Sequence, residues 1–171
     1  MTDLRQYIRD VPDFPESGIL FRDIMPLLAN HQAMDQAIQA MAMGVPPGGI
    51  DHVVAIESRG FLFGVGIAQR LERGLVLLRK PGKLPGNVRR HQYALEYGSD
   101  SLEVQADALR RGGRVLLVDD VLATGGTLAA AARLVRECGA EPVASTVLIE
   151  LEALNGRERL DGISLHSVLR Y

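Results

Sequence analysis

Two adjacent acids and a short run of small and hydroxyl-bearing residues stand close together in the second half of the chain. Asp119 and Asp120 follow the apolar run 115–118, and the segment from Ala123 to Thr127 contains two glycines and two threonines. If a helix begins here, its first N–H groups lack partners and can bind an anion, most often a phosphate. Carboxylates beside a phosphate site suit the paired hydroxyl groups of a ribose. We therefore predict a sugar phosphate ligand.

The flanking residues predict the strand and the helix that such a site needs. The apolar run 115–118, bounded by Gly112 and Gly113, is typical of a strand buried on both faces. The acids then lie at its carboxyl end, where open parallel sheets bind ligands, and their side chains point to opposite sides. The segment is not a nucleotide P-loop, because no lysine precedes Thr127. A helix ending near Gly139 is predicted by the spacing of Leu128, Ala131, Ala132, Val135 and Cys138.

A second segment repeats this design. The apolar run from His52 to Ile56 predicts a strand, and a helix is expected from Phe61 to about Arg73. The turn between them, Glu57-Ser58-Arg59-Gly60, predicts a second anion site to which Arg59 adds a fixed charge. The alternative is an arginine that is simply solvated at a helix start.

A basic segment follows the next predicted strand, Leu75 to Leu78. Its prolines and glycines make regular structure unlikely between Arg79 and His91. A long basic loop in a compact domain is more often functional, although a solvated loop and a nucleic-acid contact are alternatives. The basic residues are Arg79, Lys80, Lys83, Arg89, Arg90 and His91.

Alternating apolar residues then predict a hairpin with its turn at Gly98-Ser99-Asp100. Glu96 points away from the face that carries Tyr93 and Tyr97, and by position alone it could be a solvated glutamate. The remaining pattern predicts a short helix near Leu4–Ile8, an extended piece at 18–21, a helix between 30 and 44, a strand at 142–149, a short helix at 155–160 and a strand at 164–169. Strands that alternate with helices indicate an α/β fold.

Composition limits the class of protein. The 171 residues fit one domain, and a net charge of −2 argues against non-specific nucleic-acid binding. Charged residues throughout the first twenty positions exclude a signal-peptide core, and no apolar run is long enough for a membrane helix. The single cysteine, Cys138, is expected to be a buried thiol in a reducing compartment. We expect a cytoplasmic protein with no membrane or nucleic-acid partner.

The segment Val115–Thr127 resembles the 5-phosphoribosyl-1-pyrophosphate signature of type I phosphoribosyltransferases. Four further segments resemble the adenine phosphoribosyltransferase family: 18–23 (GILFRD), 57–64 (ESRGFLFG), 79–86 (RKPGKLPG) and 95–98 (LEYG). The resemblance implies an α/β type I phosphoribosyltransferase fold, with a mostly parallel twisted sheet flanked by helices. It also implies a flexible hairpin lid at about 81–106, mobile from the basic segment to about Leu95, and a small hood from about 1–30 and 150–171, all in one domain spanning 1–171.

The resemblance also assigns roles to residues. It implies transfer of 5-phosphoribose from 5-phosphoribosyl-1-pyrophosphate to adenine, giving AMP and pyrophosphate. The enzyme would be a homodimer. Mg²⁺ would be held mainly through substrate pyrophosphate, ribose hydroxyls and water rather than by a protein cage. Asp119 and Asp120 would hold the ribose hydroxyls, and Glu96 would be the acid/base residue. The ribose 5-phosphate would be bound by Ala123, Thr124, Gly125, Gly126 and Thr127. Pyrophosphate would be bound by Ser58, Arg59, Arg79, Lys80 and Lys83, partly across a dimer interface, with a cis peptide at Glu57–Ser58.

For the base, the resemblance implies that Phe21 stacks on the adenine ring while main-chain groups of Leu20 and Arg22 read its edge. Leu151 would close the other side of the slot. From periodicity alone, Phe21 would be a core aromatic. Two other functions stay open: a phosphoribosyltransferase for hypoxanthine, guanine or xanthine, and a regulatory protein that uses the loop as a sensor. The apolar slot favours adenine, and the negative net charge, with one domain using the whole chain, disfavours the regulator.

Overall fold

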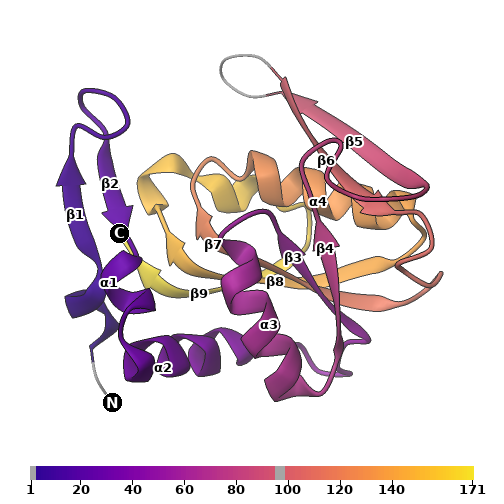
Figure 1. Ribbon diagram of the computed structural model, residues 1–171, viewed down its shortest axis with the longest axis horizontal. Coiled ribbons are helices and arrows are strands. Elements are labelled where there is room, and N and C mark those ends of the chain that lie inside the picture. Colours follow the sequence, from indigo (N-terminus) through magenta and orange to yellow (C-terminus); the bar gives the residue numbers. More distant parts are fainter. Residues whose placement is uncertain (1–2, 95–98) are drawn as a thin grey trace.

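A five-stranded parallel sheet forms the centre of the computed structural model, which describes residues 3–94 and 99–171 (Figure 1). Its strand order is β4-β3-β7-β8-β9. The chain moves outward from β3 to β4 and then returns to β7 on the other side of β3. The order therefore reverses between β3 and β7, which is where open α/β sheets form a ligand crevice. The strands are β3 (His52–Ile56), β4 (Gly74–Leu78), β7 (Arg114–Leu122), β8 (Glu141–Glu150) and β9 (Ser164–Arg170).

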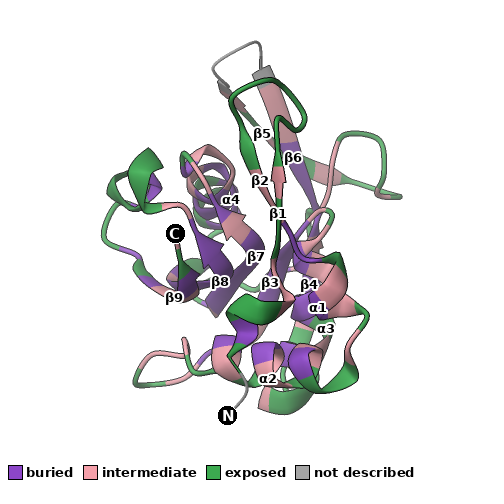
Figure 2. Cartoon of the chain, turned by 90° about the vertical axis from the view of Figure 1, so that its left-hand side faces the viewer, coloured by how far each residue is buried: buried purple, intermediate pink, exposed green. Residues whose placement is uncertain are grey.

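Helices cover both faces of the sheet, as predicted for this fold class. α1 (Met25–Leu28), α2 (His31–Ala42) and α3 (Gly60–Leu71) lie on one face, and α4 (Gly126–Glu137) lies on the other (Figure 1). Successive strand residues alternate between the two cores: Leu116 packs with the α2–α3 side and Leu117 with the α4 side. Both are fully buried, so the prediction of a strand buried on both faces is confirmed. Figure 2 shows this burial along β7 and β8.

The C-terminal ends of α3 and α4 each have a residue in the left-handed backbone conformation. α3 stops at Leu71, before the predicted Arg73, because Glu72 adopts a left-handed conformation with φ 53°. α4 ends with Gly139 at φ +83°, as predicted for the residue after the cap. Short 3₁₀ helices complete the chain at η1 (Leu4–Tyr7), η2 (Glu152–Leu154) and η3 (Gly156–Arg159). No helix in residues 3–94 and 99–171 is both long and apolar enough to span a bilayer.

Two antiparallel ribbons stand outside the central sheet. β1 (Arg9–Pro12) pairs with β2 (Leu20–Asp23), and β5 (Val88–Ala94) pairs with β6 (Ser99–Gln105). The predicted hairpin is confirmed, but its predicted turn at 98–100 is wrong, because Ser99 and Asp100 pair with Ala94 and Tyr93 as part of β6. The expectation of irregular structure up to His91 is also wrong, because β5 already begins at Val88. Its basic residues enter the strand because partners face them: Arg90 lies directly opposite Glu103. β5 lies against α4 (Figure 1).

Candidate active site

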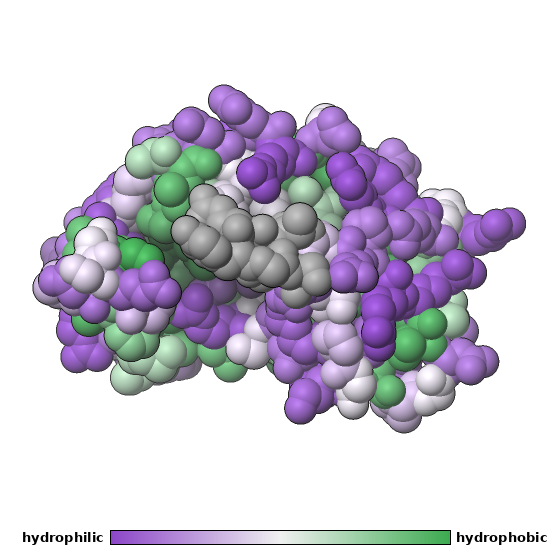
Figure 3. Space-filling model, turned by 90° about the horizontal axis from the view of Figure 1, so that it is seen from above, coloured by the Kyte–Doolittle hydropathy of each residue, from purple (hydrophilic) through white to green (hydrophobic). Residues whose placement is uncertain are grey.

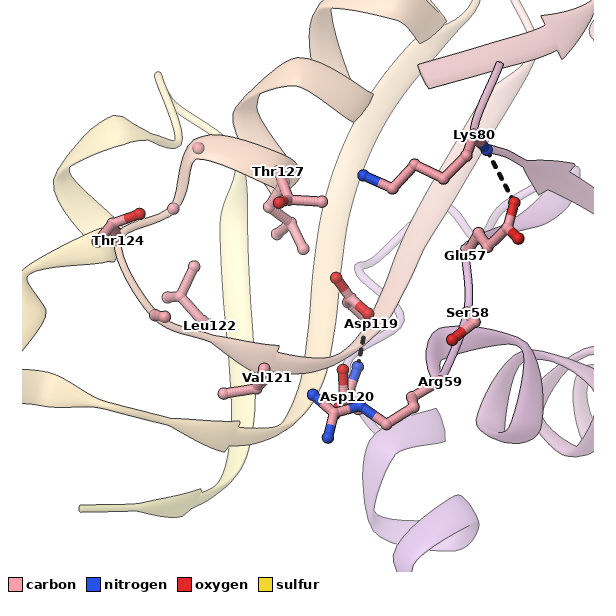
Figure 4. Close-up of a pocket in the computed structure, with 14 residues that line it drawn as sticks. Glu57, Ser58, Arg59, Lys80, Asp119, Asp120, Val121, Leu122, Thr124 and Thr127 are labelled. Atoms are coloured by element: carbon pink, nitrogen blue, oxygen red, sulfur yellow. Dashed lines mark hydrogen bonds and ion pairs between the residues drawn. The ribbon is translucent and has the colours of Figure 1, made fainter. Parts of the chain in front are cut away.

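A cavity of about 310 Å³ opens at the carboxyl ends of β3 and β7. The turn 57–59 and Lys80 form one side, and the segment 121–128, from the end of β7 to the start of α4, forms the other (Figure 4). Asp119 and Asp120 lie between them. The two predicted anion sites and the predicted acids therefore share one space, which the strand reversal between β3 and β7 creates.

The segment from Ala123 to Thr127 forms the N-terminus of α4 and the turn before it. Gly125 precedes the helix with φ +82°, a conformation that favours glycine, and no side chain of the described residues caps the helix. The N–H groups of its first turn, which includes Thr127, therefore remain available to an anion. Thr127 projects into the cavity, whereas Thr124 is exposed on the outer part of the loop (Figure 4). All five predicted phosphate-binding residues line the cavity.

Gly156 of η3 packs against this loop at Ala123 and Gly125. A Cβ atom at Gly156 would lie 2.9 Å from the Gly125 nitrogen and closer still to the Ala123 carbonyl oxygen. The backbone of η3 thus packs directly on the backbone of the loop. A short helix was predicted here but this contact was not, because a lone glycine far downstream of the loop gives no local signal for it.

The two acids are part of β7, which continues to Leu122, and they are more enclosed than a strand-end position predicts. Relative exposures are 8% for Asp119 and 5% for Asp120. Asp120 forms an ion pair with Arg59, Oδ2 to Nε, at 2.8 Å, and the Asp120 N–H donates to Asp119 Oδ1 at 2.9 Å. The Asp120 carboxylate is thus paired with a guanidinium, whereas the Asp119 carboxylate accepts from the backbone of its neighbour.

Burial raises the pKa values of both acids. The pKa of Asp119 lies well above its usual range, first because of burial and then because of the negative charge on Asp120. Burial also raises the pKa of Asp120, although the guanidinium of Arg59 opposes the shift.

The turn after β3 carries the second set of predicted residues. The peptide bond between Glu57 and Ser58 is cis, as predicted. Burial acts to raise the pKa of Glu57, but bonds from the Lys80 N–H at 2.8 Å and from the Arg79 guanidinium outweigh it and lower that pKa. Glu57 was not predicted as a functional residue, yet it joins the ends of β3 and β4. Ser58 and Arg59 line the cavity.

The three basic residues predicted after β4 are placed differently. The Lys80 side chain extends into the cavity (Figure 4), where its ammonium pairs with Asp100 of β6. Arg79 pairs with Glu57 at 3.2 Å and donates to the Lys83 carbonyl at the same distance. Within the described part of the chain, neither Arg79 nor Lys83 lines the cavity, and Lys83 is exposed. This chain alone thus brings only Lys80 of the three into the site.

The predicted base-binding residues lie beside the cavity and not among the described residues that line it. Phe21 is half-buried, with its edge against Phe14 and its ring 5.5 Å from the guanidinium carbon of Arg59. Arg59 therefore links Phe21 to Asp120. Leu20 is exposed, and Leu151, just after β8, is half-buried. Figure 3 shows hydrophobic surface at the β1–β2 end of a largely hydrophilic face, where Phe14, Ile19 and Leu20 are about half exposed.

The basic loop 79–87 is anchored by an acid that the sequence analysis missed. Glu103 of β6 is 2% exposed, accepts from the Gly82 N–H at 3.0 Å and from Arg90 Nε at 2.8 Å, and its backbone pairs with Arg79. The bonds from Arg90 and Gly82 lower the pKa of Glu103. Glu96, the predicted acid/base residue, lies outside the described residues.

The profile of the phosphoribosyl transferase domain family matches residues 27–164. The chain is 53% identical over 169 residues to adenine phosphoribosyltransferase of Gluconacetobacter diazotrophicus, covering 99% of this chain and 96% of that protein. The chain belongs to the adenine phosphoribosyltransferase family. A crystal structure of adenine phosphoribosyltransferase from Thermoanaerobacter pseudethanolicus superposes with a TM-score of 0.94 at 45% identity and covers 98% of both chains.

A second adenine phosphoribosyltransferase structure carries ligands. The enzyme from Saccharomyces cerevisiae, complexed with D-2,5-dideoxy-2,5-imino-altritol 1,6-bisphosphate and adenine, has a TM-score of 0.91 and 39% identity. It covers 97% of this chain and 96% of its own. The expected family and fold class are therefore confirmed: an adenine phosphoribosyltransferase with a central parallel sheet flanked by helices.

Proposed function

We propose that this protein transfers 5-phosphoribose from 5-phosphoribosyl-1-pyrophosphate to N9 of adenine, giving AMP and pyrophosphate. The observation that carries the proposal is the cavity itself. A helix N-terminus lies at one side, a lysine and an arginine at the other, and two acids lie between them. A sugar with phosphate groups at both ends and hydroxyl groups in the middle matches this order of charges.

Each end of the cavity would hold one end of the substrate. The loop from Ala123 to Thr127 would bind the 5-phosphate through backbone N–H groups and the Thr127 hydroxyl. Ser58, Arg59 and Lys80 would bind the pyrophosphate, and the two cations would neutralise the negative charge that develops as it leaves. Arg79 and Lys83 would join them by a rearrangement of the loop or from a partner subunit.

Asp119 and Asp120 would accept hydrogen bonds from the ribose hydroxyls and favour the positive charge that develops on the sugar ring. Carboxylates beside a pyrophosphate also fit Mg²⁺, which binds through one or two protein oxygens and substrate phosphates and keeps several waters. The metal would supply further neutralisation of the leaving group. Alignment of the two substrates in one water-poor space would contribute the remaining rate enhancement.

Adenine would lie between Phe21 and Leu151, with main-chain groups of Leu20 and Arg22 reading its edge. Stacking and backbone hydrogen bonds suit a planar, uncharged heterocycle. Glu96 would be the acid/base residue for the proton of adenine, a step worth about 10²–10⁴-fold in rate. The segment 81–106, including the β5–β6 ribbon, would act as a lid that keeps water from the activated sugar. The hood at 1–30 and 150–171 would complete the base site.

We also propose a cytoplasmic homodimer. Leu62 and Val65 lie one turn apart on α3 and are 46% and 47% exposed, so α3 presents an apolar strip to a second copy. Light scattering after size-exclusion chromatography should give twice the mass of the chain. Val65→Lys should yield monomers, whereas Arg70→Lys on the same helix should not.

The decisive test of the activity compares free bases. Purified protein with 5-phosphoribosyl-1-pyrophosphate and Mg²⁺ should convert adenine to AMP far faster than it converts hypoxanthine, guanine or xanthine, and chelation by EDTA should stop the reaction. Asp120→Asn and Thr127→Ala should lower kcat by orders of magnitude while the thermal transition remains cooperative. Preference for an oxopurine would replace adenine as the substrate, and no turnover with any base would support the sugar-phosphate sensor.

The role of Glu96 needs its own comparison. Glu96→Ala should lower kcat for adenine by about 10²–10⁴-fold. Glu141→Ala, at an exposed glutamate outside the lid and the hood, is the matched control and should keep full activity. A Glu96→Ala protein with unchanged kcat would remove the acid/base assignment and leave the rest of the proposal standing.

A further inference from the structure

Tyr171 touches both walls of the proposed adenine slot, which come from opposite ends of the chain. One wall is the Leu20–Arg22 strand, in the ribbon β1–β2, and the other is Leu151, just after β8. The end of the chain lies beside this ribbon (Figure 1). We infer that Tyr171 is a positioning residue that fixes the width of the slot and so sets the affinity for the planar base. The inference rests on the proposed function.

The ring of Tyr171 contacts the first wall of the slot through the side chain of Arg22. The guanidinium carbon of Arg22 lies 4.1 Å from the ring centroid, and the same guanidinium forms an ion pair with Asp10 of β1. The Arg22 side chain is only 20% exposed. Because Arg22 directly follows Phe21, fixing its side chain also restricts the backbone that presents Phe21 to the base.

The backbone of Tyr171 holds the second wall. Its N–H donates to the Glu150 carbonyl at 2.9 Å, and its carbonyl accepts from the Glu152 N–H at 2.8 Å. These two bonds bracket Leu151, whose own N–H donates to the Leu122 carbonyl at 2.9 Å. Leu151 is thereby fixed between β7 and Tyr171.

The ribbon needs such a tether because its strands pair only with each other among the described residues. Arg59 also contacts Phe21, but Arg59 pairs with Asp120 and belongs to the site proposed for pyrophosphate. Among the described residues that line the cavity, Tyr171 is absent, and its cation–π and backbone contacts are with Arg5, Arg22, Glu150 and Glu152. Its loss should therefore affect adenine binding without affecting 5-phosphoribosyl-1-pyrophosphate.

The experiment measures KM separately for the two substrates. Tyr171→Ala should raise KM for adenine by about tenfold, the scale of one partly desolvated cation–π contact, and leave KM for 5-phosphoribosyl-1-pyrophosphate within twofold. Tyr171→Phe keeps the ring and should restore the wild-type value. Arg110→Ala is the control: it removes an arginine that pairs with Asp51 at 2.8 Å, outside the hood and the slot, and should leave both KM values unchanged.

A double-mutant cycle tests the mechanism. Arg22→Leu should raise KM for adenine as Tyr171→Ala does, and the double variant should be no worse than either single variant, because both remove the same contact. Should Tyr171→Ala not fold, Tyr171→Leu takes its place in both comparisons. An unchanged KM for adenine, an equal rise for both substrates, or additive effects in the cycle would overturn the inference. Wild-type protein inactive on adenine would instead reject the proposed function, which separates the two failures.

Discussion

Gly156→Ala should damage the phosphate loop without adding or removing any charged group. The new methyl group would meet backbone atoms, the Gly125 nitrogen at 2.9 Å and the Ala123 carbonyl oxygen at a still shorter distance, whereas ordinary contacts begin near 3.4 Å. Backbone cannot rotate away as a side chain can, so either η3 or the loop must move.

The size of the effect follows from that displacement. A shift of about 1 Å in a group that positions substrate can cost about 100-fold in rate, equivalent to about 2.7 kcal/mol of transition-state stabilisation. We expect kcat/KM for 5-phosphoribosyl-1-pyrophosphate to fall by about 100-fold, measured by AMP formation at saturating adenine. The first turn of α4 would still be present, so the far-ultraviolet circular dichroism should not change.

Gly112→Ala supplies the control. Gly112 has φ +70° and open space around its Cβ position, so alanine there carries backbone strain of about 1–2 kcal/mol but no clash. This variant should lose thermal stability and keep its kcat/KM. A Gly156→Ala protein within threefold of wild type would show that η3 does not hold the loop, and the reasoning would be wrong.

Three further predictions concern charge and burial. Because the folded-state pKa of Asp119 is raised, the folded protein binds more protons than the unfolded chain between the ordinary and the raised pKa, so stability is lost as pH rises through this window. Asp119→Asn should therefore unfold at higher urea than wild type at pH 7, with the difference disappearing below about pH 4; a difference independent of pH would contradict this. Glu103→Gln should weaken the anchor of the loop 79–87 and accelerate tryptic cleavage after Lys83, which unchanged cleavage would refute; Glu141→Gln is the control. Cys138 is buried and burial raises its pKa, so one thiol should react with Ellman's reagent only after unfolding, and reaction in the native state would refute its placement.

Local patterns predicted the elements that carry the site. The apolar run 115–118, the small-residue loop and the periodic residues of α4 each depend on neighbours within a few positions. The chemistry of a helix start and a strand end is likewise local. For this reason the five loop residues and both acids could be placed in one site before any tertiary contact was known.

The missed features depend on partners far away in the chain. Arg90 and His91 read as loop residues because two adjacent basic side chains give no strand pattern, but Glu103 and Glu137 lie opposite them in the fold. Lys80 meets Asp100, and Gly156 meets the loop at Ala123, only once the chain has folded. No periodicity within one segment encodes such pairs, and the same holds for the ring of Tyr171 above Arg22.

The separation of the ribbon β1–β2 from the central sheet has a consequence for how this scaffold can change. The family profile spans 27–164 and so leaves out both this ribbon and Tyr171, while it includes both anion-binding turns and the acids. Of the residues proposed to contact adenine, Leu151 lies within the profile, whereas Leu20, Phe21 and Arg22 lie in the ribbon outside it. A change of base preference could therefore come from replacing the ribbon β1–β2 and its contact at Tyr171, while the turns and acids of the cavity stay unchanged.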